Sequence, residues 1–212
     1  MSLLRRVFAL QVAAGLTLMA ASFPEPPAGT ASKGKETAVL AGGCFWGTEA
    51  VFEMLKGVMD VESGYAGGSK GTANYDQVSE GRTGHAESVR ITFDPSVISY
   101  GQILKVFFSV AHDPTQLNRQ GNDVGTQYRS VIFYANDEQK KVAEAYIQDL
   151  DKAKVFPKPV VTKVQPLEAF YKAEAYHQDF VKRNPRQGYV VAAELPKLRM
   201  LERTYPEMLK GK

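Results

Sequence analysis

A single cysteine, Cys44, is the sequence feature that most constrains how this chain folds. One cysteine cannot form an intramolecular disulfide, and we do not expect a zinc framework from one cysteine and three histidines. The 212 residues must therefore be held together by a hydrophobic core, which a chain of this length can bury. Hydrophobic residues make up 44% of the chain and charged residues 23%, as is typical of globular proteins. We expect one domain with extensions and no metal site.

The first 22 residues have the pattern of an export signal. Arg5 and Arg6 precede an apolar run over residues 7–21, which is short for a bilayer-spanning helix of about 20 apolar residues. The run ends in Ala20-Ala21-Ser22, which fits a signal-peptidase cleavage pattern. We therefore predict a signal peptide over 1–22 and export, to the bacterial periplasm. An uncleaved membrane anchor facing the periplasm is the alternative, and the arginine pair leaves the general and the twin-arginine export routes both open.

Residues 23–35 are rich in Pro, Gly, Ala, Ser and Thr, and we interpret them as a flexible linker before a domain over 36–212. The charge balance of this domain does not favour nucleic-acid binding. The whole chain has 26 basic and 23 acidic residues, a net charge of +3. Without Arg5 and Arg6 the counts are 24 and 23, a net charge of +1. The sequence also lacks a basic stripe with interleaved aromatic residues.

The hydrophobic pattern of residues 36–212 mixes strands and helices without strict alternation. Strands are predicted at 37–41, 58–63, 86–93, 129–134 and 160–164. Helices are predicted between Cys44 and Gly57, around 103–111, over 137–150 and over 170–180. Two glycine-rich segments, 64–84 and 112–127, are predicted as long loops, which are often functional. The predicted fold class is α+β, a mixed β-sheet with helices packed on it.

Cys44 is the first candidate for chemistry. It follows Gly42-Gly43 and opens a predicted helix, where the helix dipole lowers a thiol pKa and favours a nucleophilic thiolate. The alternative is an inert buried cysteine. Export into an oxidising compartment favours a reactive role, because a lone thiol is a liability there. The neighbours Phe45 and Trp46 either form the wall of a small apolar pocket or pack in the core.

Glu87 is the second candidate, because it shares the strand phase of Val89, Ile91 and Phe93. An acidic residue on the apolar face of a strand is either a solvated strand-end residue or a buried carboxyl group. Burial would raise its pKa and make it a proton donor near neutral pH. The periodicity alone leaves both interpretations open.

The two loops supply further polar groups. Tyr75, Asp123 and Tyr128 carry hydroxyl and carboxylate groups of the kind that can bind an oxyanion-like oxygen, directly or through water, although each residue taken alone is more typical of ordinary loop structure. His85 lies in a loop and His112 in a turn. His177 falls on the apolar stripe of the last predicted helix, where a core histidine is the expected interpretation.

Ordered motifs across residues 37–200 resemble the peptide methionine-sulfoxide reductase A family. The motifs are Gly43-Cys44-Phe45-Trp46-Gly47-Thr48-Glu49, Gly64-Tyr65-Ala66-Gly67-Gly68, Tyr75, Gly84-His85-Ala86-Glu87, His112-Asp113-Pro114-Thr115, Gln120-Gly121-Asn122-Asp123, Gly125-Thr126-Gln127-Tyr128-Arg129-Ser130, Tyr176-His177-Gln178 and Pro196-Lys197-Leu198. Any one of these would be weak, but their common order makes chance similarity implausible.

The resemblance implies a fold, a reaction and residue roles. The fold is an α+β sandwich related to the ferredoxin-like fold. The residue matching Cys44 attacks the sulfur of methionine S-sulfoxide, free or in proteins, and the residue matching Glu87 helps to protonate the departing oxygen. The residues matching Tyr75, Asp123 and Tyr128 hold that oxygen, and those matching Phe45 and Trp46 receive the substrate methyl group. The products are methionine and a Cys44 sulfenic acid.

The chain departs from many relatives in one respect. They carry a resolving cysteine after a Gly-Tyr or Pro-Tyr pair, whereas here Gly188-Tyr189 is followed by Val190. We therefore expect an external thiol, either a small thiol or a thioredoxin-like protein, to reduce the Cys44 sulfenic acid. We expect no bound cofactor, no stable membrane insertion after cleavage, and a monomer, because no heptad pattern is present.

Three other functions stay open on the residues alone. A cysteine hydrolase would pair Cys44 with His85 or His177. A thiol peroxidase would not need the aromatic pair. A non-catalytic binder of oxidised methionine would have lost turnover together with the resolving cysteine.

Overall fold

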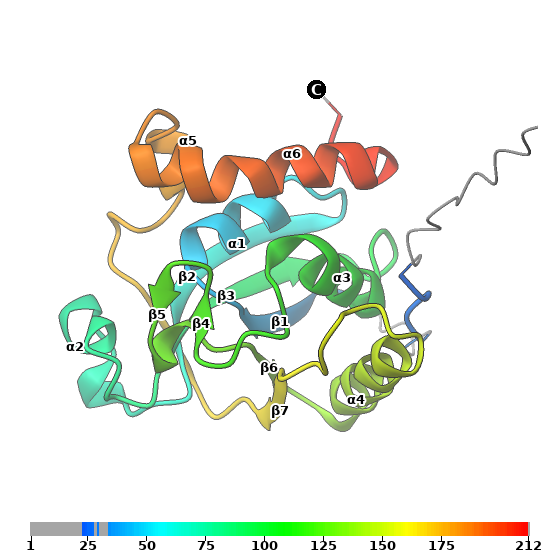
Figure 1. Ribbon diagram of the computed structural model, residues 1–212, viewed down its shortest axis with the longest axis horizontal. Helices are drawn as coiled ribbons and strands as arrows, with labels where there is room; N and C mark the ends of the chain where they lie inside the picture. The colour runs from blue at the N-terminus through cyan, green and yellow to red at the C-terminus, as the bar shows by residue number, and fades with distance from the viewer. Residues whose placement is uncertain (1–22, 28, 30–33, 212) are drawn as a thin grey trace, which may run out of the picture.

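The computed structural model describes residues 23–27, 29 and 34–211, so the predicted signal peptide over 1–22 lies outside the described residues. A six-stranded sheet, in the order β7-β6-β1-β3-β2-β8, forms the centre of the domain (Figure 1). Neighbouring strands are antiparallel except β6 and β7, which are parallel. The sheet strands are β1 (Glu36–Ala41), β2 (Val58–Ala66), β3 (Ala86–Phe93), β6 (Val131–Tyr134), β7 (Lys163–Pro166) and β8 (Phe170–Lys172).

Four of these strands form the ferredoxin-like arrangement. In chain order the elements are β1, α1, β2, β3, α3 and β6, and the four strands lie side by side as β6-β1-β3-β2. The helices are α1 (Phe45–Glu53), α2 (Tyr75–Ser79), α3 (Tyr100–Val106), α4 (Asp137–Lys152), α5 (Phe180–Arg183) and α6 (Leu195–Thr204). The predicted α+β class with a mixed sheet is confirmed. Among the described residues, no helix is long and apolar enough to cross a membrane.

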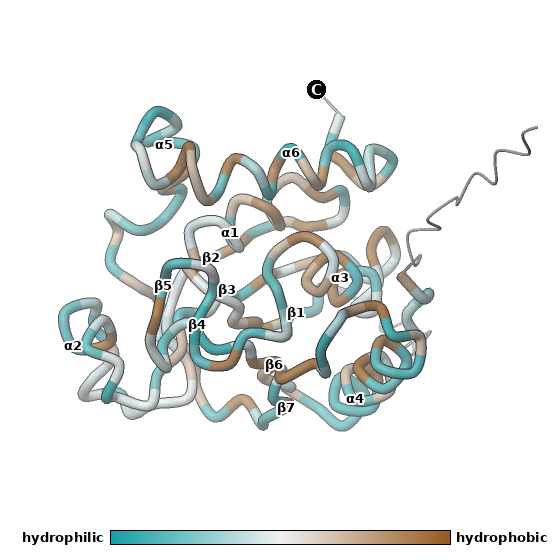
Figure 2. The backbone as a smooth tube through the Cα atoms, in the orientation of Figure 1, coloured by the Kyte–Doolittle hydropathy of each residue, from teal (hydrophilic) through white to brown (hydrophobic). Residues whose placement is uncertain are grey.

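The main core lies between the sheet and the helices α1, α3 and α4. Phe52 from α1, Leu104 from α3 and Tyr146 from α4 are buried there against Leu40 and Ile91 of the sheet. Figure 2 shows hydrophobic segments in β1 and β6 and alternating hydrophobic and hydrophilic stretches along α4. Burying these apolar side chains supplies the stability that a chain with one cysteine cannot take from disulfides.

The strand β3 places its buried face as its sequence predicts. Val89, Ile91 and Phe93 are fully buried, whereas Arg90 and Thr92 are half-buried. The strand pairs with β1 on one side and with β2 on the other, where Tyr65 lies opposite Glu87. Because side chains alternate along a strand, Glu87 points to the same face as the core.

The predicted helix over 170–180 is wrong. Phe170–Lys172 is the edge strand β8, which pairs with β2 from Gly64 to Ala66, and the only helix in this region is the four-residue α5. The apolar residues Phe170, Ala173, His177 and Phe180 recur at helical spacing. Pairing with the free edge of β2, however, satisfies the backbone of 170–172 without a helix. The predicted strand at 160–164 is also displaced, since β7 begins at Lys163.

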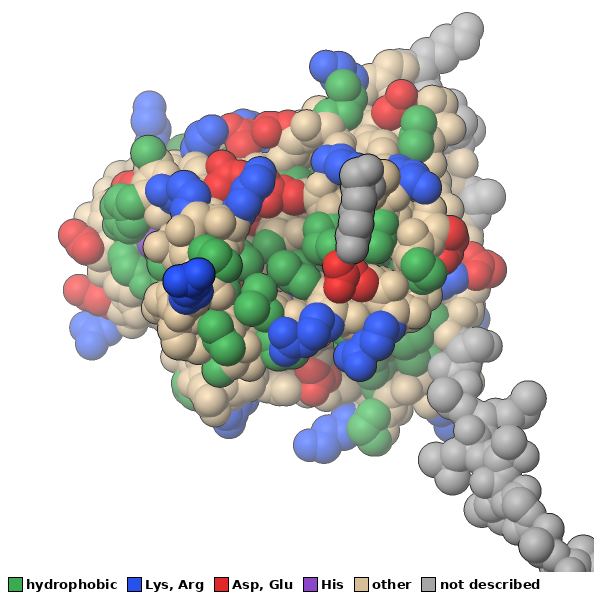
Figure 3. Space-filling view, turned by 90° about the horizontal axis from the view of Figure 1, so that it is seen from above, with side chains coloured by type: hydrophobic (Ala, Val, Ile, Leu, Met, Phe, Trp, Pro, Cys, Tyr) green, Lys and Arg blue, Asp and Glu red, His purple; other side chains and the backbone are tan. Residues whose placement is uncertain are grey.

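A C-terminal helix that was not predicted from the sequence covers α1. The chain forms a π-helical turn over Val190–Glu194, continues directly into α6, and packs on α1 as an outer layer (Figure 1). Figure 3 looks onto this side of the molecule and shows hydrophobic side chains gathered between Lys and Arg side chains. The layer therefore buries one side of the helix that begins after Cys44.

The two predicted loops contain short elements and are fastened to each other. Residues 64–84 include α2, and residues 112–127 include the hairpin of β4 (Arg119–Gln120) and β5 (Asp123–Val124). Thr126 Oγ1 donates a hydrogen bond to the carbonyl oxygen of Gly81 (2.6 Å), and Gln127 Nε2 donates to that of Ser79 (2.9 Å). Arg129 adds bonds to the carbonyls of Gly84 and His85. These bonds hold the two loops together at one end of the sheet.

The described part of the predicted linker lies against the domain. Phe23 packs edge-on against Phe156, with ring centroids 5.7 Å apart. The Tyr146 hydroxyl donates a hydrogen bond to the carbonyl oxygen of Pro24 (3.1 Å), and Glu25 pairs with Lys105.

Candidate active site

Cys44 occupies the N-cap position of α1, directly after β1 and two glycines. Gly43 has φ +84°, a backbone conformation that favours glycine. A Cβ atom at this position would lie 2.6 Å from Cγ of Gln120, so space also requires glycine. The Gly43 N–H donates a hydrogen bond to the Tyr128 carbonyl oxygen (3.3 Å). The turn thus fixes Cys44 between the sheet and the second loop.

Glu87 lies beside this turn as a buried carboxyl group. Its side chain is 2% exposed, and its Oε2 accepts a hydrogen bond from the Phe45 N–H at 3.1 Å. Burial raises the pKa of Glu87 to about 8; the charges of Asp123 and Glu194 act in the same direction, and the Phe45 N–H opposes them. Of the two interpretations that the sequence left open, the structure therefore supports the buried carboxyl group, which keeps its proton at neutral pH.

The expectation of a lowered Cys44 pKa is wrong for the protein in this state. Burial raises the pKa of the Cys44 thiol well above its usual value, and the charges of Glu87 and Glu194 raise it further. The N–H of Trp46, at the helix N-terminus, and the charge of Lys197 lower it but are outweighed. The helix terminus therefore favours the thiolate as predicted, but the burial that accompanies it has the larger effect.

A cavity of about 290 Å³ brings all seven predicted site residues together. Its lining consists of Cys44, Phe45, Trp46, Tyr75, Glu87, Asp123, Tyr128, Gln187 and Tyr189. The first seven are the residues singled out in the sequence. Gln187 and Tyr189 were not predicted as site residues. Tyr189 was considered only because Val190, and not a cysteine, follows it, and no sequence motif singled out Gln187.

An aromatic wall forms one side of the cavity. The Trp46 ring stacks on Phe180 with centroids 3.7 Å apart and an interplanar angle of 9°. Trp46 Nε1–H donates a hydrogen bond to Nδ1 of His177 at 3.0 Å. His177 is thus buried as predicted, but it lies on a turn rather than a helix and it orients Trp46. Burial lowers the His177 pKa, which favours the neutral ring that this acceptor role requires.

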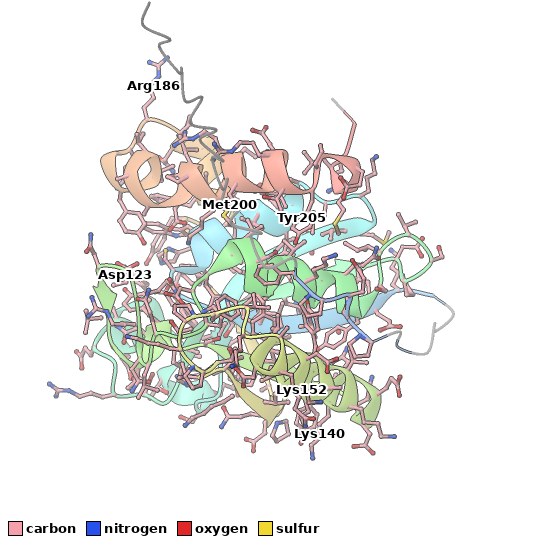
Figure 4. All side chains as sticks on the ribbon, turned by 45° about the vertical axis from the view of Figure 1, so that its right-hand side comes forward. Asp123, Lys140, Lys152, Arg186, Met200 and Tyr205 are labelled. Carbon is pink, nitrogen blue, oxygen red and sulfur yellow. The ribbon has the colours of Figure 1, made fainter. Side chains whose placement is uncertain are left out.

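Polar side chains form a second wall of the cavity. Tyr75 begins α2, where its N–H donates a hydrogen bond to Glu174 (2.9 Å). The Tyr189 hydroxyl donates to Asp123 Oδ2 at 2.5 Å, and Figure 4 shows Asp123 on its hairpin at the end of the molecule that carries α5. Burial raises the pKa of both Tyr75 and Tyr128, so their hydroxyl groups keep their protons and remain hydrogen-bond donors.

No histidine is among the described residues that line the cavity. His85 Nε2 contacts the Ser69 carbonyl oxygen at 3.0 Å, and His112 lies between the Phe107 carbonyl oxygen and Ser130. The Nδ1 atom of His177 is used by Trp46. The geometry therefore does not favour a cysteine hydrolase, which needs a histidine within hydrogen-bonding reach of the thiol.

The fold and the cavity together define a thiol-dependent oxidoreductase with an aromatic pocket. The family model described as "Peptide methionine sulfoxide reductase" matches residues 36–208. The chain therefore belongs to the peptide methionine sulfoxide reductase family.

Relatives and solved structures agree with this membership. The chain is 55% identical to peptide methionine sulfoxide reductase MsrA 2 of Synechocystis sp. over 87% of this chain and 86% of that protein. It is 50% identical to peptide methionine sulfoxide reductase MsrA of Saccharolobus solfataricus, over 82% of this chain and 97% of that protein. Among solved structures, reduced Mxr1 from Saccharomyces cerevisiae has a TM-score of 0.66 and 35% identity over 72% of this chain and 87% of that one. Methionine sulfoxide reductase A of Corynebacterium diphtheriae has a TM-score of 0.62 and 35% sequence identity, and the match covers 73% of this chain and 77% of that one.

Proposed function

We propose that this protein reduces methionine S-sulfoxide, free or in exposed protein segments, to methionine by way of a Cys44 sulfenic acid. The observation that carries the proposal is the placement of Cys44 and the buried Glu87 on the wall of one cavity, joined through the Phe45 N–H. A sulfoxide sulfur accepts a nucleophile only when its oxygen takes a proton. The cavity supplies both the nucleophile and the proton.

Glu87 and Cys44 carry out the chemical step. The Cys44 sulfur attacks the sulfoxide sulfur while the Glu87 carboxyl group, whose pKa is about 8, protonates the oxygen. The oxygen ends on Cys44, and the methionine sulfur leaves reduced by two electrons while Cys44 is oxidised by two. The thiol proton ends in the sulfenic acid hydroxyl, and Glu87 regains the proton it lent. The net change is thiol plus sulfoxide to sulfenic acid plus thioether.

The two walls of the cavity bind different parts of the substrate. The hydroxyl groups of Tyr75 and Tyr128 donate hydrogen bonds to the sulfoxide oxygen as negative charge develops on it, and Asp123 assists through Tyr189 or water. Phe45 and Trp46 receive the methyl group on an apolar surface. One fixed oxygen site and one fixed methyl site together select a single epimer of the chiral sulfur.

An external thiol restores Cys44. The thiol attacks the sulfenic acid, water leaves, and a mixed disulfide forms; a second thiol then releases the Cys44 thiol and a disulfide. The sequence has no second cysteine to replace the external thiol. The candidates are a small thiol and a thioredoxin-like protein. The pattern of residues 1–22 supports a role in repairing oxidised proteins after export to a bacterial periplasm.

Steady-state assays with separated sulfoxide epimers test this proposal. With added dithiothreitol, we expect methionine from the S epimer, little from the R epimer, and none with the Cys44→Ser variant. A non-catalytic binder would release no methionine while Cys44→Ser kept its affinity. A thiol peroxidase would consume hydrogen peroxide much faster than sulfoxide. Either result would contradict the proposal.

A further inference from the structure

An ion pair with a fully buried carboxylate and a half-buried ammonium group lies against the first turn of α1, close to Cys44 but outside the cavity lining. Glu194 is 0% exposed and ends the π-helical turn, and its Oε2 lies 2.8 Å from Nζ of Lys197 on α6. A Cβ atom built on Gly47 would lie 1.6 Å from Glu194 Oε2 and 3.1 Å from Lys197 Nζ. The pair therefore touches α1 three residues after Cys44, where only glycine leaves room for it.

Nothing in the proposed reaction uses this carboxylate. Apart from the Lys197 ammonium group, neither Glu194 oxygen has a hydrogen-bonding partner among the described residues. A buried carboxylate with so little compensation is unfavourable for folding, and a buried ion pair is often no more stable than apolar residues of the same shape. A residue that brings this unfavourable contribution invites a functional explanation.

We propose that Glu194 and Lys197 set the charge of Cys44, and that Glu194 keeps the Cys44 sulfenic acid neutral, and so protected from overoxidation, until the external thiol arrives. The first half of this proposal, the effect of the ion pair on the charge of Cys44, does not depend on the proposed reaction. The second half, the protection of the sulfenic acid from overoxidation, rests on the proposed function, because the proposed reaction generates that sulfenic acid.

Titratable and charged groups face Cys44 from all the elements packed around it. They are Tyr75 of α2, Glu87 of β3, Asp123 of β5, Tyr128 directly after the second loop, Tyr189, and the ion pair of Glu194 and Lys197. The tyrosines are neutral, because burial raises the pKa values of Tyr75, Tyr128 and Tyr189, and Glu87 is mostly protonated at neutral pH. The Glu194 carboxylate, which pairs with Lys197 Nζ at 2.8 Å, is a negative charge near the sulfur, and its repulsion raises the pKa of Cys44.

A negative charge near the sulfur matters because overoxidation of the sulfenic acid proceeds through its anion. The deprotonated sulfenate attacks hydrogen peroxide: a new S–O bond forms, the O–O bond breaks, and the product is a sulfinate plus water. Cys44 is oxidised by two electrons and the peroxide is reduced by two. A neighbouring carboxylate disfavours the sulfenate anion by repulsion. The sulfenic acid has no cysteine partner in this chain and must wait for an external thiol.

Alkylation of the reduced protein by iodoacetamide as a function of pH tests the first half without any sulfoxide. For Glu194→Gln we expect the Cys44 profile to move down by about one pH unit, which corresponds to about tenfold faster alkylation at neutral pH. Lys197→Arg, which keeps the cation, should leave the profile in place. Glu202→Gln, an exposed charge change on the same helix, is the matched control.

The double variant Glu194→Gln/Lys197→Met separates charge from packing. If the effect is electrostatic, removing both charges returns the profile toward that of the wild type. If Glu194→Gln merely loosens the site, the double variant is at least as reactive as the single one, and the proposal is overturned. An unchanged or upward-shifted profile for Glu194→Gln overturns it as well.

The second half is tested on sulfenic acid made with one equivalent of methionine S-sulfoxide and then exposed to hydrogen peroxide. Mass spectrometry should show the Cys44 sulfinic acid forming several-fold faster in Glu194→Gln than in the wild type and in Glu202→Gln. Equal rates would overturn this half. If the wild type releases no methionine in the first step, the proposed function fails, and the alkylation profiles still decide the charge effect.

Discussion

The backbone N–H of Phe45 donates a hydrogen bond to Oε2 of Glu87 at 3.1 Å, across 42 residues of sequence. This bond ties the first turn of α1 to the start of β3, and it holds the proton donor beside the nucleophile that precedes Phe45. Because Glu87 is buried, its pKa lies at about 8 and its proton is present at neutral pH. The same burial that makes Glu87 a proton donor also keeps the Cys44 thiol protonated at rest.

Replacing Glu87 by Gln should remove the proton donor while keeping the shape of the side chain. We expect the single-turnover rate of sulfoxide reduction to fall by about 100-fold or more, as is typical when a general acid is lost. The wild-type rate should also fall as pH rises above about 8, because Glu87 then loses the proton that it donates. This alkaline fall should be absent in Glu87→Gln. A variant with the wild-type rate would exclude Glu87 as the acid.

The phenol groups of Tyr75 and Tyr128 should act on the rate more than on binding. Removing one donor to a developing negative oxygen costs about 100-fold in many enzymes, and less where a second donor remains. We therefore expect Tyr75→Phe and Tyr128→Phe each to lower kcat by about tenfold, and the double variant to lower it by much more than either. Tyr134→Phe, on β6 away from the cavity, is the control. Loss of kcat in that control would show that the effect is not local.

The His177 ring should act on substrate binding through Trp46. Its Nδ1 accepts the Trp46 Nε1–H, so His177→Leu should raise KM about fivefold, the usual effect of one hydrogen bond, with kcat little changed. His177→Gln keeps an acceptor and should stay near the wild type. The His177 pKa is lowered by burial, so the wild-type KM should rise only at acidic pH, where the ring gains a proton and stops accepting. A KM for His177→Gln that rose in the same way with acid would contradict this role.

Gly43→Ala should damage both the turn before Cys44 and the rate. The φ of +84° and the 2.6 Å approach of Gln120 leave no room for a methyl group, and such strain costs about 1–3 kcal/mol. Denaturant unfolding should show this loss of stability, together with slower sulfoxide reduction. Gly71→Ala, where nothing lies within 4 Å, should change neither quantity. Equal stability of the two variants would show that the turn tolerates the change.

The parts of the fold that were predicted correctly are those in which the local sequence pattern is compatible with only one secondary structure. The alternation over 86–93 identified β3 and the face that carries Glu87, and Gly42-Gly43 at the end of the apolar run 37–41 identified the turn before Cys44. The helix prediction for 170–180 was wrong because four residues at helical spacing are also compatible with an edge strand followed by turns. Only the unpaired edge of β2, a long-range feature, decides between them.

The candidate site likewise has residues that could be predicted from the sequence and features that could not. The seven predicted residues, from Cys44 to Tyr128, line one cavity, and for this the ordered motifs were the guide. Gln187 and Tyr189, which also line the cavity, were missed because the π-helical turn and the C-terminal helix that follow them were not predicted. Whether Glu87 was buried, and in which direction the Cys44 pKa moved, depended on packing that periodicity does not report.

A single turnover without reductant tests the central claim most directly. Reduced protein is mixed with excess methionine S-sulfoxide, and the released methionine and the oxidation state of Cys44 are both measured. We predict about one methionine per protein molecule and a Cys44 sulfenic acid that dimedone traps, with turnover resuming only when a thiol is added. The account would be contradicted by the absence of methionine with Cys44 still a thiol, or by continued turnover without any thiol.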